Sequence, residues 1–517
     1  MQILLCSLVL AAGLSPLLTF ERLLQLKEWR RDRLREHLRR EGRFSQLFGI
    51  VRPSVTILGL IVYFSLIAFK STAEFAWISL VTTYGALVWL MLFKFVLGKQ
   101  SRPVWTMKAV STFTLAILLY FVVALILAGF NDLAWVMVIL SLLPLTSFCF
   151  VISAWIVLRP LDQFLKRRVL KKARAIRRKM PNLAVIGITG SVGKTTTKEL
   201  LAHILSDRSL LVTPAHVNTE MGVANLIRRS LKESHQIFIV EMGAYRRGEI
   251  KLLCALTEPH IGIITYIGRQ HLGLFGSQDD LCSAKGELFE ALPPEGHAFL
   301  NADTTFCENL MKKASCPVHT VGTGGHATYE AFDIVEEPAG IAFTLRGAQF
   351  HVPILGTHQV TNILLAVAAA ETLGVPVAES AKRLASFSAP TQTFERKEGR
   401  QGQVVLDDTY NASPESFRAV IEWSRTHAAK KKILITSGLL ELGKEERLIH
   451  EELGLLSREI FHEAIFLNKK CVHNFEQGYG KPVRVFPRQK FALKIEKDML
   501  IVCVGRMPET IVEKLLT

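Results

Sequence analysis

Long apolar segments crowd into the first 160 residues of the chain, whereas shorter apolar runs alternate with polar stretches after them. Five of the early segments are almost free of charge and approach the length of a bilayer-spanning helix, about 20 residues: 2–20, 54–69, 75–93, 109–130 and 133–158. One such run alone is compatible with a buried helix of a soluble core. Five of them in so short a stretch favour membrane-spanning helices, and we predict a helical membrane region over residues 1–180.

The basic residues set the expected orientation of these helices. Lys and Arg gather beside the apolar segments, in 22–52, 94–108 and 159–179, and are scarce in the short loops 70–74 and 131–132. Cytoplasmic loops of membrane proteins are enriched in Lys and Arg. We therefore predict a multi-pass protein of the cell's inner membrane, with its N-terminus outside and its C-terminal part in the cytoplasm.

The net charge of +16 indicates an anionic partner. Because the basic residues lie beside apolar segments, membrane lipids are favoured over nucleic acid. The segments 21–48 and 160–179 are expected to be basic helices on the inner leaflet, or else solvated linkers. No carboxylate or histidine stands out inside the apolar segments, so a transport pathway is not predicted. The eight cysteines lack metal-ligand spacing and are expected to be reduced thiols.

From residue 181 onward, runs of strand length alternate with helical stretches, which is typical of mostly parallel α/β sheets. The first set of runs is 183–190, 210–214, 237–243, 261–267 and 297–301. The second set is 403–406, 432–436, 464–467, 483–486 and 499–504. We predict a central α/β domain over 181–390, a small Rossmann-like domain over 391–517, and a hinge at 390–402 between them.

The stretch IGITGSVGKTTTKE, residues 186–199, reads as a strand, a glycine-punctuated turn and a helix beginning near Thr195. That order predicts a phosphate-binding loop, in which backbone N–H groups and a helix N-terminus surround an anion. Lys194 would reach the terminal phosphates of ATP, and the Thr195 hydroxyl would bind Mg²⁺. The strict pattern has Gly in place of Ile188, so an ordinary tight turn is the alternative. The residues expected at the nucleotide are Gly190, Ser191, Val192, Gly193, Lys194, Thr195 and Thr196.

Three further residues are candidates for a metal site. Glu241 directly follows a strand, where a carboxylate near a phosphate loop is well placed to hold Mg²⁺, with an ordinary surface acid as the alternative. His271 follows another strand, and a lone histidine there is more often structural than a ligand. Lys285 lies in SAKGEL on a predicted helix, where an exposed lysine is the default.

Seven ordered motifs together resemble the Mur ligase family, ATP-dependent enzymes that join an amino acid or a peptide to a carboxylate, and within it the MurF branch. The motifs are ITGSVGKTTTKE, VNTEMGV, IVEMGAYRRGEI, HLGLFGS, SAKGELF, GTHQVTN and LDDTYNASPES. The family's variant of the loop, TGxxGKT, accommodates Ile188. The resemblance covers about residues 183–517 and implies a P-loop Mur ligase central domain followed by a Rossmann-like C-terminal domain.

The resemblance also assigns roles to single residues. Lys194 and Thr195 would bind the ATP phosphates and a first Mg²⁺, which Glu241 would also ligate. His271 would ligate a second Mg²⁺. Lys285 matches the family lysine that is carbamylated, which turns a cation into a carboxylate-like metal ligand. Lys194, Glu241, His271 and Lys285 are therefore the implied catalytic set.

Two more residues match nucleotide contacts of the family: Asn362 an ATP-contacting asparagine, and Asp408 a ribose or phosphate contact. In the implied reaction a carboxylate attacks the γ-phosphate of ATP to give an acyl phosphate and ADP, and an amine then displaces phosphate. The partners would be ATP, a peptide-bearing envelope precursor carried on a nucleotide or a lipid, and an amino acid or dipeptide.

Three of the chain's departures from the family bear most on its substrates. The membrane region stands where the family has its UDP-sugar-binding first domain. Gln392-Thr393 replaces the usual Gly-Arg, and Val504-Gly-Arg-Met507 replaces the C-terminal Lys-Gly-Ser. Two alternatives therefore stay open: a non-catalytic membrane scaffold that still binds nucleotide, and a ligase that acts on a polyglutamate-type polymer.

Overall fold

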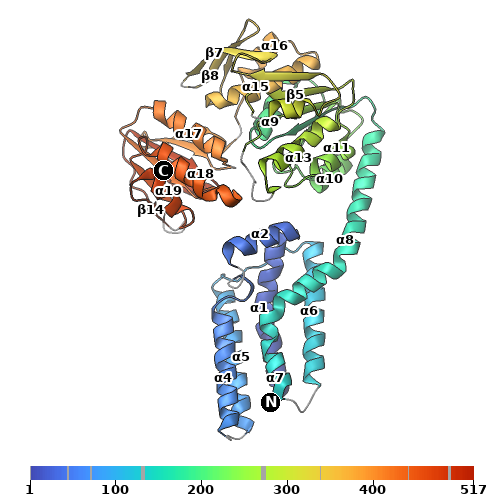
Figure 1. Ribbon diagram of the computed structural model, residues 1–517, viewed down its shortest axis with the longest axis vertical. Helices are drawn as coiled ribbons and strands as arrows, with labels where there is room; N and C mark the ends of the chain where they lie inside the picture. Colours follow the sequence, from blue (N-terminus) through green and yellow to red (C-terminus); the bar gives the residue numbers. More distant parts are fainter. Residues whose placement is uncertain are drawn as a thin grey trace. The chain divides into compact units, whose positions relative to one another are not determined.

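The computed structural model describes residues 2–42, 46–69, 73–129, 134–268, 275–304, 306–337, 339–389, 391–410, 412–439, 442–486 and 491–517. The chain divides into two compact units, Met1–Lys166 and Arg167–Thr517. The first is helical and the second contains two sheets (Figure 1). The predicted boundaries at 180/181 and 390/391 stay predictions.

The first unit is built from apolar helices. They are α1 (Gln2–Leu26), α2 (Arg31–Glu41), α4 (Val51–Ala68), α5 (Ala73–Val96), α6 (Met107–Ala128), α7 (Ala134–Leu142), the 3₁₀ turn η1 (Leu143–Thr146) and α8 (Ser147–Arg178). Five spans are long and apolar enough to cross a membrane: Ile3–Leu26, Val51–Ala68, Phe75–Val96, Met107–Leu127 and Val138–Arg178. The five predicted segments fall on these spans, so their helical and apolar character is confirmed.

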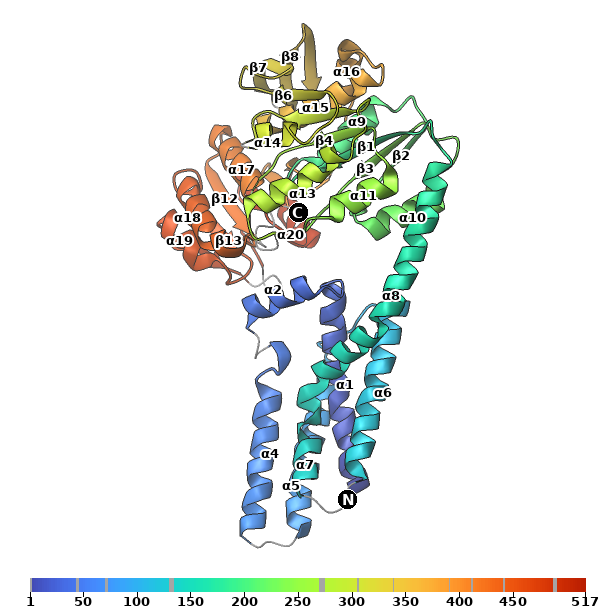
Figure 2. The ribbon, with the colours of Figure 1, turned by 45° about the vertical axis from the view of Figure 1, so that its right-hand side comes forward.

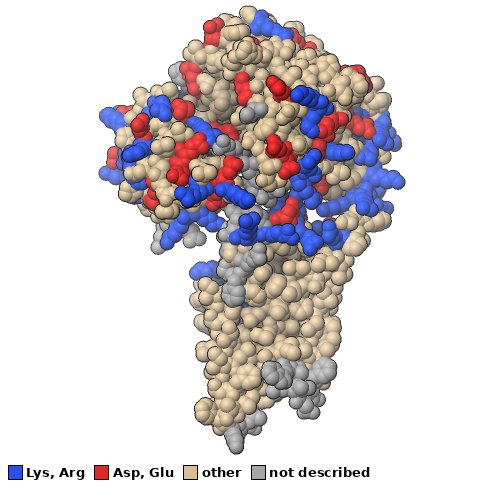
Figure 3. Space-filling model, in the orientation of Figure 1, with Lys and Arg blue, Asp and Glu red and all other residues tan. Residues whose placement is uncertain are grey.

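The outward faces of these helices are hydrophobic. Large side chains such as Ile61, Trp89, Leu118 and Ile156 are each more than half exposed. Figure 3 shows a face of this unit with hardly any charged side chain. An apolar surface of this extent is unfavourable in water, which agrees with the length and composition of the helices.

One carboxylate does lie inside the first apolar helix. Helix α1 continues beyond Phe20 to Leu26, so Glu21 is part of it, and the Glu21 side chain is fully buried. Among the described residues neither carboxylate oxygen accepts a hydrogen bond. The predicted segment 2–20 stopped short of this first charged residue, whereas the helix and the candidate span continue through it to Leu26.

Helix α8 begins in the first unit, and its last turns belong to the second. Ala173 is fully buried there in the core. The Arg177 guanidinium is 2% exposed and donates hydrogen bonds to the carbonyl oxygens of Thr257 (2.8 Å), Glu258 (3.3 Å) and Met180 (2.8 Å). Arg177 therefore caps the C-terminus of α11 (Glu249–Thr257), as a cation near the last carbonyls of a helix should. The stretch 160–179 was expected to lie on a leaflet or in solvent; in its second half Ala173 and Arg177 are buried in the second unit instead, while Lys171, Lys172, Arg178 and Lys179 are exposed.

The second unit contains a nine-stranded sheet in the order β2-β3-β1-β4-β5-β6-β7-β8-β9. Its strands are β1 (Ala184–Thr189), β2 (Leu210–Val212), β3 (Ile237–Glu241), β4 (Ile261–Ile264), β5 (His297–Asn301), β6 (Val318–Gly322), β7 (Tyr329–Glu337), β8 (Gly340–Leu345) and β9 (Ala348–Val352). β1 to β7 pair in parallel, as expected of strands buried on both faces. The β7-β8-β9 extension is antiparallel.

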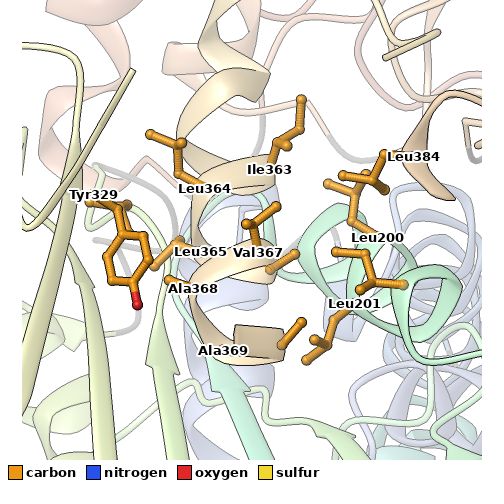
Figure 4. Packing of buried hydrophobic residues seen from close by; sticks show 14 of the residues in the cluster. Leu200, Leu201, Tyr329, Ile363, Leu364, Leu365, Val367, Ala368, Ala369 and Leu384 are labelled. Atoms are coloured by element: carbon orange, nitrogen blue, oxygen red, sulfur yellow. The ribbon is translucent and has the colours of Figure 1, made fainter. Parts of the chain in front are cut away.

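Helices cover both faces of this sheet (Figure 2). They are α9 (Lys194–Ile204), α10 (Glu220–Ser230), α11, α13 (Gln278–Glu290), α14 (Cys307–Met311), α15 (Val360–Thr372) and α16 (Val377–Leu384). On one face α15 is buried almost all round, and its Leu364 and Val367 lie among side chains of α9, α16 and β7 (Figure 4). Because α15 packs against α9, the residues at the start of α15 reach the loop before α9.

A six-stranded sheet forms the C-terminal part in the order β10-β11-β15-β12-β13-β14. Its strands are β10 (Glu395–Glu398), β11 (Val404–Asp408), β12 (Lys431–Thr436), β13 (Glu463–Phe466), β14 (Arg484–Val485) and β15 (Met499–Val504), and its helices are α17 (Pro414–Thr426), α18 (Glu446–Ser457), α19 (Val472–Tyr479) and α20 (Glu509–Leu516). β10 is antiparallel to β11, and all the other pairs of the sheet are parallel. The five predicted runs are confirmed as strands.

Candidate active site

The residues 186–199 form a strand, a loop and a helix, as predicted. Helix α9 begins at Lys194, and both loop glycines have positive φ, 149° at Gly190 and 86° at Gly193. A Cβ atom at Gly193 would lie 2.2 Å from Asn362 Oδ1, and one at Gly190 would lie 1.9 Å from Thr265 Oγ1. The loop therefore needs glycine at both positions, for conformation and for space.

Neighbouring segments hold this loop in place. The Ser191 amide donates to the Tyr266 carbonyl (2.7 Å), and the Thr265 hydroxyl donates to the Val192 carbonyl (2.5 Å). On the other side, Thr197 donates to Asn362 Oδ1 (3.3 Å). These bonds fix a concave loop ahead of a helix N-terminus, the arrangement that binds anions through backbone amides.

The Lys194 side chain folds back over the loop. Its ammonium donates hydrogen bonds to the carbonyl oxygens of Gly190 (2.8 Å) and Ser191 (2.9 Å). Burial lowers the pKa of Lys194, and the nearby Glu241 carboxylate partly opposes this. The Lys194 ammonium therefore lies over the part of the loop where a phosphate would bind.

Glu241 ends β3 beside the start of α9. The Thr195 hydroxyl donates to its Oε2 (3.0 Å), and Asn218 Nδ2 donates to its Oε1 (3.1 Å). At 5% exposure Glu241 is no ordinary surface acid. The structure therefore brings together Thr195 and Glu241, a hydroxyl and a carboxylate, which are the oxygen ligands that Mg²⁺ prefers. Thr196 is buried next to them in α9.

Two partners of Glu241, Asn218 and Lys198, were not predicted from the sequence. The Lys198 ammonium lies 3.6 Å from Glu241 Oε2. Both residues fall within motifs already identified, VNTEMGV and ITGSVGKTTTKE. Their position in those motifs was the available signal, but no spacing rule linked them to a strand 23 or 43 residues further along.

Lys285 is buried on α13, so the default of an exposed lysine was wrong. Its side chain is 3% exposed and forms no hydrogen bond or ion pair with any residue that the structure describes. Burial, with a further contribution from the Lys194 cation, lowers the pKa of Lys285 to about 7. The Lys285 amine is therefore close enough to Lys194 to feel its charge, and about half of it is uncharged at neutral pH.

Asp408 ends β11 in the C-terminal sheet. It is 5% exposed, and burial raises its pKa to about 6. Oδ1 accepts a hydrogen bond from the Phe394 amide (3.3 Å), whereas Oδ2 has no partner among the described residues. Two residues later, the Tyr410 hydroxyl lies 3.1 Å from Nδ1 of His216, which follows β2 in the central sheet. The loop that follows β2 and the loop that follows β11 are therefore in contact.

These residues fit Mg²⁺ and a nucleotide. Among the described residues no three His, Cys, Asp or Glu side chains gather to hold a metal. Mg²⁺ at phosphate loops uses few protein ligands and relies on phosphates and water, so Thr195 with Glu241 suffices. The glycine-lined loop supplies the phosphate cradle, and buried Lys285 offers an amine near it. His271, the proposed ligand of a second Mg²⁺, lies outside the described residues.

Comparison with known proteins identifies relatives of this arrangement. Residues 188–370 match the Mur ligase middle domain. The UDP-N-acetylmuramoyl-tripeptide–D-alanyl-D-alanine ligase of Bacillus subtilis is 34% identical over 274 residues, 52% of this chain and 59% of that enzyme. The ligase of the same name from Synechocystis sp. is 34% identical over 288 residues, 55% of this chain and 62% of that enzyme. The chain thus spans about three fifths of the length of these relatives.

Solved structures similar to this chain include MurF ligases. MurF from Acinetobacter baumannii has a TM-score of 0.62 at 27% identity, and the match covers 68% of this chain and 80% of that one. MurF ligase from Thermotoga maritima in complex with ADP has a TM-score of 0.59 at 25% identity, covering 68% and 82%. These structural matches therefore cover more of the chain than residues 188–370, which match the middle domain.

Proposed function

Because this chain belongs to the Mur ligase family, we propose that it is an ATP-dependent, ADP-forming ligase that joins a carboxylate of a peptide-bearing cell-envelope precursor to an amino acid or dipeptide. The observation that carries the proposal is one connected group of residues: Lys194 is hydrogen-bonded to the glycine-lined loop, and the neighbouring Thr195 is hydrogen-bonded to Glu241. Buried Lys285 lies close enough to this group for the Lys194 charge to lower its pKa. MurF-type relatives named for adding D-alanyl-D-alanine make that dipeptide the first co-substrate to test.

Each residue of this set has a task in the reaction. Loop amides and the Lys194 ammonium bind the phosphates of ATP and hold the γ-phosphate in position. Thr195 and Glu241 hold Mg²⁺, which when bound neutralises charge on the phosphoryl oxygens. The acceptor carboxylate attacks the γ-phosphorus and ADP leaves; the amine then attacks the acyl carbon, phosphate leaves, and the amine loses a proton. Asn362, near the start of α15, and Asp408, at the end of β11, are the other proposed contacts to the nucleotide.

The environment of Lys285 suits carbamylation. Only an uncharged amine adds to CO₂, giving a carbamate and a proton. With a pKa of about 7, about half of Lys285 is uncharged at neutral pH, against about one in 3,000 for an ordinary lysine. The product is an anion placed among Lys194 and the metal-binding residues. We propose that this carbamate, with His271, holds the second Mg²⁺.

Ligase activity is therefore expected to depend on dissolved CO₂. Protein stripped of CO₂ in degassed buffer should be slow and should recover when CO₂ is restored at a fixed dissolved concentration. Because a depressed lysine pKa leaves the amine protonated below that pKa, recovery should be weak below pH 7 and fuller above it. ADP release measured from pH 6 to pH 8.5 checks this. Recovery that is equally fast across this pH range would contradict it.

The membrane proposal rests on the five apolar helices. Tags fused at residues 1 and 517 are expected to report opposite sides of the membrane, because the described residues contain five such helices, an odd number, and the basic segments lie at alternate connections. Protease protection in sealed vesicles is the measurement. Protection of both tags from the same side would contradict the topology.

The test of the proposed function uses the full chain in lipid nanodiscs. ADP release is followed with nucleotide-linked and lipid-linked muropeptides and with polyglutamate, each with candidate amino acids and with D-alanyl-D-alanine. Lys194→Met, which lacks the loop cation, is the inactive control. Ligated product with one acceptor class supports the proposal and identifies the carrier.

A scaffold without catalysis is the second candidate, and the departure at Gln392-Thr393 favours it. Gln392 keeps a positive φ of 60°, a conformation suited to the glycine that the family has there. The accompanying arginine is missing from this chain. The scaffold predicts tight ATP binding without ADP release for every acceptor offered.

A further inference from the structure

A second lysine of α9, Lys198, lies one helical turn after Lys194 and is completely buried. Buried lysines are rare and need partners. The Lys198 ammonium donates a hydrogen bond to the Thr213 carbonyl oxygen (2.8 Å) and pairs with Glu199 Oε1 (3.1 Å). Its remaining neighbour is the Glu241 carboxylate, at 3.6 Å.

These contacts join three elements that meet at the metal-binding residues. Thr213 directly follows β2 and is itself 1% exposed. Its hydroxyl accepts a hydrogen bond from the Glu241 amide (2.9 Å), while its carbonyl accepts one from Lys198. Lys198, Thr213 and Glu241 therefore form a closed set of contacts between α9 and the ends of β2 and β3.

The same set determines where the Glu241 carboxylate points. Oε1 is held by Asn218, and Oε2 lies between the Thr195 hydroxyl and the Lys198 ammonium. We infer that Lys198 is a positioning residue, which holds the Glu241 carboxylate oriented toward Thr195 so that the pair binds a divalent cation. This inference rests on the proposed function, since it gives Glu241 its role in Mg²⁺ binding.

A purely structural lysine would behave differently. It would stabilise the protein without changing metal affinity. Altering a residue that positions a metal ligand, in contrast, typically lowers metal affinity or activity by about 10- to 100-fold. We expect a loss of metal affinity in that range for Lys198. The two roles are separated by measuring metal binding and unfolding on the same variants.

The experiment uses the full chain with ADP and Mn²⁺, whose binding is read by electron paramagnetic resonance, alongside thermal unfolding. Lys198→Met removes the charge at similar length and is expected to raise the Mn²⁺ Kd by about 10- to 100-fold. ADP affinity in EDTA should stay within about twofold, because the loop and Lys194 are unchanged. The exposed Lys251 of α11 gives the matched control, Lys251→Met, with an unchanged Mn²⁺ Kd.

If Lys198→Met does not fold, Lys198→Gln decides, because its amide still donates to Thr213 but carries no charge. A Mn²⁺ Kd within twofold of the parent in a folded variant overturns the inference, and a lower unfolding temperature would then mark Lys198 as structural. Failure of the parent protein to bind ADP at all would instead overturn the proposed function.

Discussion

Lys285→Ala is expected to bind ATP almost normally and to ligate on the order of 10²–10³-fold more slowly, the loss typical of removing one preorganised electrostatic contact. The binding part follows from geometry, because the phosphates are held by the loop amides and Lys194, and Lys285 forms no hydrogen bond to either. The slow ligation follows from the lost carbamate, which leaves the second metal site without its anionic ligand. ATP affinity and single-turnover product formation measure the two parts separately.

Two companions make this test specific to the carbamate. Short carboxylic acids such as acetate are expected to restore part of the activity of Lys285→Ala, since they can occupy the vacated space as a surrogate anion. Lys285→Arg should stay inactive, because a guanidinium forms no carbamate and keeps its positive charge beside Lys194. The exposed Lys251→Ala should ligate normally. Near-normal ligation by Lys285→Ala would refute the assignment of this lysine.

The sequence predicted those parts of the fold whose hydrophobic pattern is unambiguous. The spans of the five apolar helices and five of the six strands of the C-terminal sheet are visible as runs of apolar residues. β10 was missed because its residues, ERKE, form a polar edge strand with no apolar face to detect. β6 to β9 of the central sheet were also not predicted; in β7 a register shift between Phe332 and Val335 breaks the alternation of buried and exposed side chains.

The site was predictable to a different degree at each residue. The loop glycines and Lys194 follow from local spacing, and their geometry is as expected. The environment of Lys285 does not follow from spacing, because its burial depends on α13 packing against α11, α14 and the strands β1 and β4. Asn218 and Lys198 were missed for the same reason: only parallel pairing of β2 and β3 brings Thr213 and Glu241 together.

The second prediction with a large effect concerns the shape of the loop. Gly193→Ala is expected to abolish measurable ATP binding at concentrations that saturate the parent. The added Cβ would lie 2.2 Å from Asn362 Oδ1, at a φ of 86° that costs a non-glycine residue about 1–2 kcal/mol. Forcing an extra methyl group into a packed site costs about 1–3 kcal/mol more. Either the loop or Asn362 must move, and both are proposed to contact the nucleotide.

A matched control separates the clash from the backbone strain. Gly248 precedes α11 with a nearly identical φ of 89°, but a Cβ there would meet nothing within 4 Å. Gly248→Ala should therefore lower the free energy of unfolding by about 1–2 kcal/mol and bind ATP like the parent. Isothermal titration and chemical denaturation of both variants make the comparison. If Gly193→Ala lost no more ATP affinity than Gly248→Ala, the loop would not be the phosphate site, and the nucleotide would have to bind elsewhere on the sheet.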